Sequence, residues 1–255
     1  MKQIIVNADD FGINDIVTSE IERMIVKGCV TSTTVMANGV CLDEVKQFAL
    51  LHPEVSFGVH LCLSEFDSIT KSEGLYKAGL TDERGVFIKK AIFALKNLED
   101  NNVQQAIKAE LCAQIEVVKN LGFPISHADS HHHVHTLYPL HTVFEEVLKS
   151  YGIKRIRLCI GFNTLRSKAH VLNYIKHIKL NRFYKFHFIT TDAVYGYNSF
   201  ISAGEPLKEG QIVELMCHPG HPSVRYRQEM ESVEVNRIVN NKDICLISYR
   251  ELSDR

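Results

Sequence analysis

The chain has 255 residues, a formal net charge of −1 and 45% hydrophobic residues, which allows a sizeable buried core. The near-neutral charge provides no general basic field, so we do not expect nucleic acid as a partner. No segment has the pattern of a secretory signal or a transmembrane span, so we expect a cytoplasmic protein.

Short apolar segments alternate with amphipathic segments, which is typical of parallel strands covered by helices. The apolar segments predict strands at residues 3–7, 33–37, 55–63, 126–129, 155–160, 186–190 and 212–217, with a weaker eighth at 244–248. The amphipathic segments predict helices between Asn14 and Gly28 and at residues 42–51, 101–120, 138–151 and 224–240. This pattern indicates an α/β, (β/α) barrel-like single domain over residues 1–255, complete or incomplete. An open doubly wound sheet is the alternative, although no glycine-rich dinucleotide fingerprint follows the first strand.

Two segments depart from this alternation. Residues 64–86 carry three glycines and predict a long excursion, a common place for substrate contacts. Residues 165–187 are basic with interleaved apolar side chains. An ordinary surface helix is one interpretation, and a helix lying on an anionic membrane surface is the other.

Carboxylates and histidines occupy the carboxyl ends of four predicted strands. These residues are Asp9, Asp10, His60, Asp129, His131 and His218. Active sites of (β/α) barrels gather at the carboxyl ends of the strands, so we expect these side chains to converge on one pocket. Carboxylate and neutral imidazole are common ligands of divalent metals with an open coordination position. The pattern therefore predicts a metal-dependent hydrolase.

Each of these residues also has a plainer interpretation. Asp9 and Asp10 repel each other unless a cation or a proton separates them, which favours one ligand and one general base, but a turn or an N-cap is the alternative. His60 is either a metal ligand or a core histidine bonded to the backbone. His218 is either a general acid for a leaving amine or a capping or core histidine.

Residues 127–135 contain five histidines beside an aspartate. If the predicted strand continues, residues 127, 129, 131, 133 and 135 share one face. One metal ion cannot use all of them, and His131 is the expected ligand because it lies just past the strand end. Asp129, His127 and His133 are then expected to contact substrate or to orient the ligands.

A set of motifs in the order of the chain, over residues 2–220, resembles the YdjC-like carbohydrate deacetylase family. The motifs are Asn7-Ala8-Asp9-Asp10-Phe11-Gly12, Thr31-Ser32-Thr33-Thr34 with Asn38-Gly39, Gly58-Val59-His60, the histidine-rich segment 127–135 and Met216-Cys217-His218-Pro219. The resemblance implies a (β/α) barrel-like fold related to polysaccharide deacetylases. One branch of this family removes an N-acetyl group from chitin disaccharide, and another acts in hopanoid lipid maturation.

The resemblance also implies roles for individual residues. It implies one divalent metal ion held by Asp10, His60 and His131, with Asp9 as general base and His218 as general acid. The two aspartates could exchange roles. The family description implies Mg²⁺, whereas the softness of two imidazole ligands favours Zn²⁺, cobalt or nickel.

We therefore expect an enzyme, a metal-dependent carbohydrate N-deacetylase that releases acetate from a small saccharide, free or lipid-linked. One alternative is a metal-dependent hydrolase of another bond, such as a phosphoester. A second is a non-catalytic sugar-binding or metal-storage protein. The sequence leaves the particular sugar and the oligomeric state open, a homodimer included.

Overall fold

The structure, a computed structural model, describes residues 2–160, 168–203, 207–223 and 243–253. Within these ranges seven strands form one parallel sheet in the order β4-β3-β2-β1-β6-β5, and β7 pairs with the beginning of β1. The strands are β1 (Lys2–Phe11), β2 (Ser32–Val35), β3 (Ser56–Leu61), β4 (Ala128–Ser130), β5 (Ala193–Gly196), β6 (Ile212–Cys217) and β7 (Ile244–Leu246). The α/β, half-barrel arrangement confirms the fold class that the sequence predicted.

The sheet continues past β4 through single bridge positions. Ala128 donates its N–H to the carbonyl of Arg155 over 3.0 Å and accepts the N–H of Arg157 over 3.0 Å. The N–H of Ile189 then bonds to the carbonyl of Lys154 over 2.9 Å. The predicted strands at residues 155–160 and 186–190 are therefore wrong as continuous strands, because only isolated bridges form there.

The failure of the predicted strand at residues 186–190 has a local cause. Helix α6 (Lys168–His187) extends into the predicted strand, and it buries Leu180 and Tyr184 at helical spacing. Phe186 thus belongs to the helix, and residues 188–190 form only the single bridge at Ile189. On the side away from β1, the strand that pairs with β6 is β5, which was not predicted from the sequence.

The remaining helices within the described ranges are α1 (Asp15–Val26), α2 (Leu42–Leu51), α3 (Glu73–Lys77), α4 (Asn101–Lys119), α5 (His141–Ser150) and α7 (Tyr197–Ala203). Three of them, α1, α2 and α4, confirm their predictions. The predicted helix 138–151 begins as a 3-10 turn, Tyr138–Leu140, and only then becomes α5. The predicted helix 224–240 lies outside the described residues.

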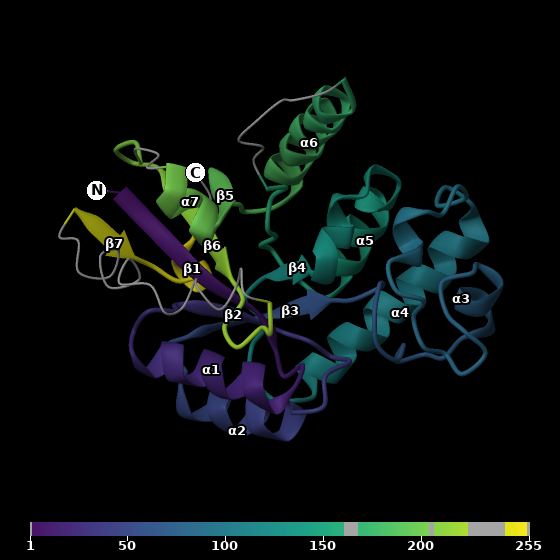
Figure 1. Cartoon of the computed structure of the whole chain (residues 1–255), viewed down its shortest axis with the longest axis horizontal. Coiled ribbons are helices and arrows are strands. Elements are labelled where there is room, and N and C mark those ends of the chain that lie inside the picture. The colour runs from purple at the N-terminus through teal and green to yellow at the C-terminus, as the bar shows by residue number, and fades with distance from the viewer. Residues whose placement is uncertain (1, 161–167, 204–206, 224–242, 254–255) are drawn as a thin grey trace.

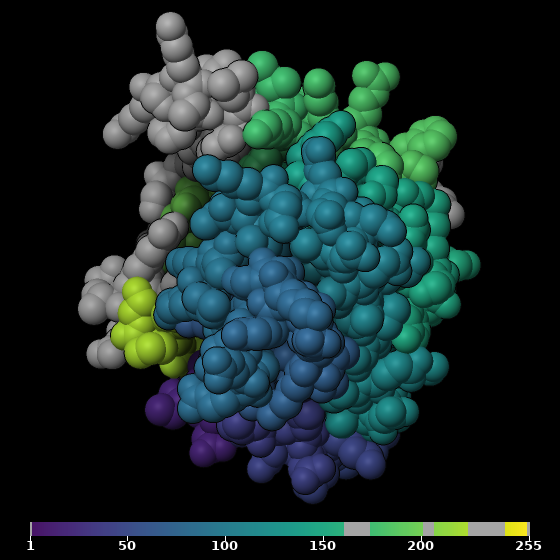
Figure 2. Space-filling model, turned by 90° about the vertical axis from the view of Figure 1, so that its right-hand side faces the viewer, coloured from purple at the N-terminus to yellow at the C-terminus, as the bar shows by residue number. Residues whose placement is uncertain are grey.

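The helices surround the sheet and leave the carboxyl ends of its strands free to form a site. Helices α1 and α2 lie together on one side of the sheet, and α4 and α5 lie beside β3 and β4 (Figure 1). The segment that joins β3 to α4, coloured blue, covers much of another face of the molecule (Figure 2). Within the described residues, none of the helices combines the length and apolar character that crossing a membrane requires.

Candidate metal centre

The end of β1 presents two neighbouring aspartates to the interior. In a regular strand, consecutive side chains point to opposite faces. Here the register between β1 and β2 shifts between Ala8 and Phe11, and Asp10 has a φ of 70°. Such a bulge redirects a side chain, and a left-handed aspartate persists only where its surroundings impose that conformation. Asp9 and Asp10 are consequently both buried and both reach the same cavity.

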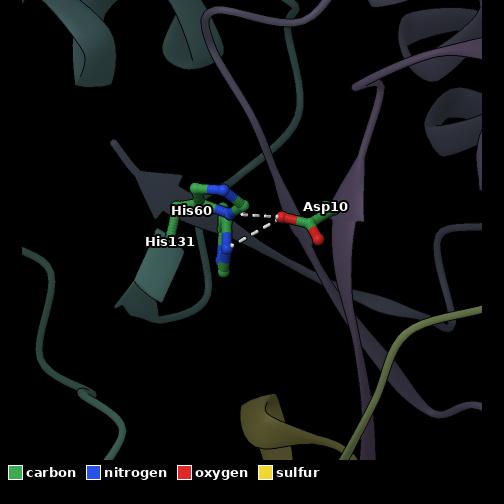
Figure 3. Close-up of side chains that lie close together, drawn as sticks. All are labelled: Asp10, His60 and His131. Atoms are coloured by element: carbon green, nitrogen blue, oxygen red, sulfur yellow. Dashed lines mark hydrogen bonds and ion pairs between the residues drawn. The ribbon is translucent and has the colours of Figure 1, made fainter. Parts of the chain in front are cut away.

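Asp10 meets two histidine side chains that come from the ends of two other strands. Its Oδ1 atom lies 3.1 Å from Nε2 of His60 and 2.8 Å from Nδ1 of His131 (Figure 3). One donor atom from each residue lies within 4.8 Å of the others. One carboxylate and two imidazoles, with a cavity on their remaining side, are a donor set that suits a divalent cation with an open position.

The charged state of Asp10 suits a cation ligand, whereas that of His60 depends on the two carboxylates beside it. Burial opposes the charge on Asp10, but the imidazoles of His131 and His60 hold its pKa well below the ordinary value. Burial likewise opposes a charge on His60, and the carboxylates of Asp129 and Asp10 raise its pKa well above the ordinary value. The site therefore keeps its carboxylate ionised and ready to ligate.

Asp129 lies behind His60, on the side away from Asp10. Its Oδ1 atom is 2.6 Å from Nδ1 of His60, and its Oδ2 atom accepts the hydroxyl of Thr34 over 3.1 Å. A carboxylate in this place fixes the tautomer and the ring orientation of a metal-binding imidazole. Asp129 is thus placed to orient the imidazole of His60, and it does not line the cavity.

Arg157 is a central residue of the site that the sequence analysis missed. It is fully buried and donates two hydrogen bonds to Asp9, of 2.7 and 2.6 Å. It also lies 2.7 Å from Asp129 and donates to Glu214 over 2.7 Å. The available signal was an arginine directly between the apolar residues Ile156 and Leu158, since an arginine cannot be buried without partners.

The two hydrogen bonds from Arg157 determine the ionisation state of Asp9. Burial opposes its charge, yet the Arg157 guanidinium lowers its pKa below the ordinary value. The side-chain amide of Asn7 adds a third hydrogen bond, of 2.9 Å. Asp9 is therefore a firmly held carboxylate at neutral pH.

His218, which follows β6, completes the group of predicted residues around the cavity. Its Nε2 atom is 3.8 Å from Oδ2 of Asp9. Burial lowers the pKa of His218 below its ordinary value, although the two aspartates act in the opposite direction. The imidazole is therefore mainly neutral near pH 7.

The histidine-rich segment does not continue as a strand. His132 and His133 have φ values of 51° and 57°, and the chain turns through a pair of short 3-10 segments over His131–Thr136. The predicted common face of residues 127–135 is therefore wrong. His127 is fully buried away from the cavity, stacked on Tyr249 at 3.8 Å and bonded to Asn7 over 3.0 Å. His133 does line the cavity.

The cavity has a volume of about 430 Å³. Six of its lining residues were predicted from sequence: Asp9, Asp10, His60, His131, His133 and His218. Five others were not: Lys90, Phe93, Ser130, His132 and His221. A cavity of this size, lined by histidines, carboxylates and a lysine, admits a small hydrophilic molecule.

Three comparisons relate the chain to known proteins. A family model described as YdjC-like protein matches residues 3–249. Relatives named carbohydrate deacetylase include one from Vibrio cholerae, 31% identical over 85% of this chain and 78% of its own, and one from Thermoanaerobacter pseudethanolicus, 30% identical over 96% and 93%. A solved structure from Enterococcus faecalis V583, provisionally named as a cellobiose-phosphate cleavage protein, is 26% identical, with a TM-score of 0.74 over 99% of both chains.

Proposed function

The chain belongs to the YdjC-like protein family, and on this basis we propose that it is a metal-dependent carbohydrate deacetylase. It removes the N-acetyl group from an N-acetylated amino sugar and releases acetate. The observation that carries the proposal is the convergence of Asp10, His60 and His131 on a cavity that Asp9 and His218 also line. The name of the curated relatives, carbohydrate deacetylase, supports the same reaction.

Asp10, His60 and His131 are the residues that would hold one divalent cation. When bound, such a cation polarises a carbonyl oxygen and makes a water molecule more acidic. The two imidazoles favour zinc, cobalt or nickel over magnesium, while the family resemblance implies magnesium. The metal content of the purified protein decides between them.

The other residues of the site accept and donate protons. Hydrolysis adds a water oxygen to the acetyl carbon, breaks the C–N bond and delivers a proton to the departing amine. Asp9 accepts a proton from the water, and its contact with Arg157 makes it a weak base that does not retain the proton. His218 is mainly neutral, so it must gain a proton before it can give one to the amine. The 3.8 Å separation between the two side chains is longer than a hydrogen bond, so a transfer from Asp9 to His218 requires a closer approach of the two groups or one bridging water.

The substrate is a small N-acetylated saccharide, free or lipid-linked. The cavity volume of about 430 Å³ supports one or two sugar units at the site. A single domain and a cytoplasmic location stay predictions from the sequence, and the oligomeric state, a homodimer included, stays open.

The proposal is tested by acetate release from N-acetylated mono-, di- and lipid-linked saccharides, with p-nitrophenyl phosphate as a contrasting substrate. We expect acetate release, one cation per chain and no phosphatase activity. Asp9→Asn should keep the cation and lose most of the turnover, about 10²–10⁴-fold, because a proton acceptor is removed. His60→Ala should lose the cation itself. Absence of acetate from every saccharide with the metal-loaded protein would refute the proposal.

A further inference from the structure

Both ring nitrogens of His131 face a carboxylate. Nδ1 is 2.8 Å from Asp10, and Nε2 is 3.2 Å from Oε2 of Glu65. Glu65 belongs to the excursion after β3, and its side chain is 22% exposed beside a His131 side chain that is 12% exposed. Glu65 is not among the site residues predicted from the sequence, and it takes no part in the proposed proton transfer.

The arrangement around His131 repeats the arrangement around His60. In each case one nitrogen faces Asp10 and the other faces a second carboxylate: Asp129 at 2.6 Å for His60, and Glu65 for His131. A carboxylate behind a metal-binding imidazole holds the ring and makes the ligating nitrogen more basic. Two unrelated segments of the chain supply this same feature to the two histidines.

We propose that Glu65 is a positioning residue for His131. Its carboxylate accepts the Nε2–H group and so leaves the Nδ1 lone pair directed at the cation site beside Asp10. This inference rests on the proposed metal-dependent function, because it assigns His131 as a ligand.

The surroundings of Glu65 argue against a second cation between Glu65, His131 and His132, although their donor atoms are close enough. The ammonium group of Lys89 already forms an ion pair with Glu65. A second cation would have to compete with that ammonium for the same carboxylate. It would also have to share the ring of His131 with the first site, which requires an imidazole without any proton.

Helix α4 holds the excursion on both sides of Glu65. The fully buried side chain of Gln114 bonds to both the N–H and the carbonyl of Cys62, over 2.8 and 2.7 Å. The fully buried carboxylate of Glu110 accepts the N–H groups of Ile69 and Thr70, over 2.8 and 2.9 Å. Glu65 therefore sits between two anchored points, which limits the positions that its carboxylate can reach.

The test uses Co²⁺ as the probe, with affinity measured by competition against a chromophoric chelator and geometry followed by the visible absorption of bound Co²⁺. Glu65→Met removes the acceptor, whereas Glu65→Gln keeps a neutral amide oxygen. We expect Co²⁺ affinity to fall about 10–100-fold for Glu65→Met and less for Glu65→Gln, with a changed spectrum in the former. Glu73→Gln, an exposed carboxylate of the same excursion, is the matched control and should bind as the wild type does.

The outcomes separate this inference from the proposed function. Wild-type protein that binds no Co²⁺ overturns both. Wild-type protein that binds one Co²⁺ per chain, with unchanged affinity and spectrum in Glu65→Met, overturns only the role of Glu65. Two ions in the wild type and one in Glu65→Met would make Glu65 a direct ligand and also overturn the positioning role. The unfolding midpoints of the metal-free variants are compared with that of the metal-free wild type, and equal midpoints verify that the fold is intact.

Discussion

At the scale of single residues, Arg157 does the most to define the site. Its guanidinium has no solvent contact and forms ion pairs with Asp9, Asp129 and Glu214, which lie on β1, β4 and β6. It therefore links the residue proposed as proton acceptor to the residue that orients His60. A buried cation in this place neutralises carboxylates that would otherwise repel one another.

Replacing Arg157 by Met should be strongly destabilising, because three buried carboxylates lose their cation. Removal of one partner from a buried ion pair lowers the free energy of unfolding by about 3–5 kcal/mol. Urea unfolding of the metal-free protein measures this loss. Arg84→Met is the control, since Arg84 is 83% exposed and should change the free energy by less than about 0.5 kcal/mol. A loss for Arg157→Met as small as that of the control would mean that the carboxylates are not charged in the folded protein.

At the scale of elements, α4 positions the site although it contributes no ligand. Its buried residues Glu110 and Gln114 are one helical turn apart and bond to each other over 2.8 Å. Together they hold the end of β3 and the excursion that follows it. A polar pair on the buried face of a helix is stable here because backbone groups of the excursion satisfy it.

The change Glu110→Ala should loosen the excursion. The N–H groups of Ile69 and Thr70 lose their acceptor, at about 1–3 kcal/mol of stability for a buried group left unpaired. Hydrogen exchange of these two amides should accelerate, whereas the amides in the middle of β1 should keep their protection. Glu116→Ala, on the exposed side of the same helix, should leave both sets unchanged. Equal acceleration in the two variants would show that α4 does not anchor the excursion.

At the scale of the whole molecule, buried neutral histidines make the fold sensitive to acid. His127 and His135 are both fully buried. Burial, together with the Arg157 guanidinium, holds the pKa of His127 well below its ordinary value. Burial, with His133 and Arg157, does the same for His135. In the unfolded chain these rings titrate near pH 6.5, so the unfolded state binds more protons below that pH.

The free energy of unfolding should therefore decrease as the pH falls below about 6.5, by up to about 1.4 kcal/mol per pH unit for each such histidine. The stability from His127 is fully present above pH 6.5 and is lost towards its lower folded-state pKa. His60 acts in the opposite direction because its pKa is raised. The comparison of wild type with His127→Gln between pH 7.5 and 5 isolates one ring. An identical pH slope in the two proteins would contradict the prediction.

Local patterns in the chain were sufficient for much of the architecture. The apolar stripe of α1 and the apolar run of β6 depend on whether a residue faces the core, which neighbours along the chain reveal. The same patterns placed Asp10, His60, His131 and His218 at strand ends. Parallel strands bring such ends to one edge, so a common pocket could be expected before any coordinates were known.

Other features depend on how distant segments pack. The bulge that turns Asp10 to the same side as Asp9 arises from the pairing of β1 with β2. The turn at His132 and His133 has a left-handed backbone conformation, which the alternation of side chains in a strand does not predict. The partners of Arg157 and of Glu65 are many residues away in the chain. A side chain's own neighbours carry no information about which distant group it meets, because folding alone brings those groups within hydrogen-bond distance.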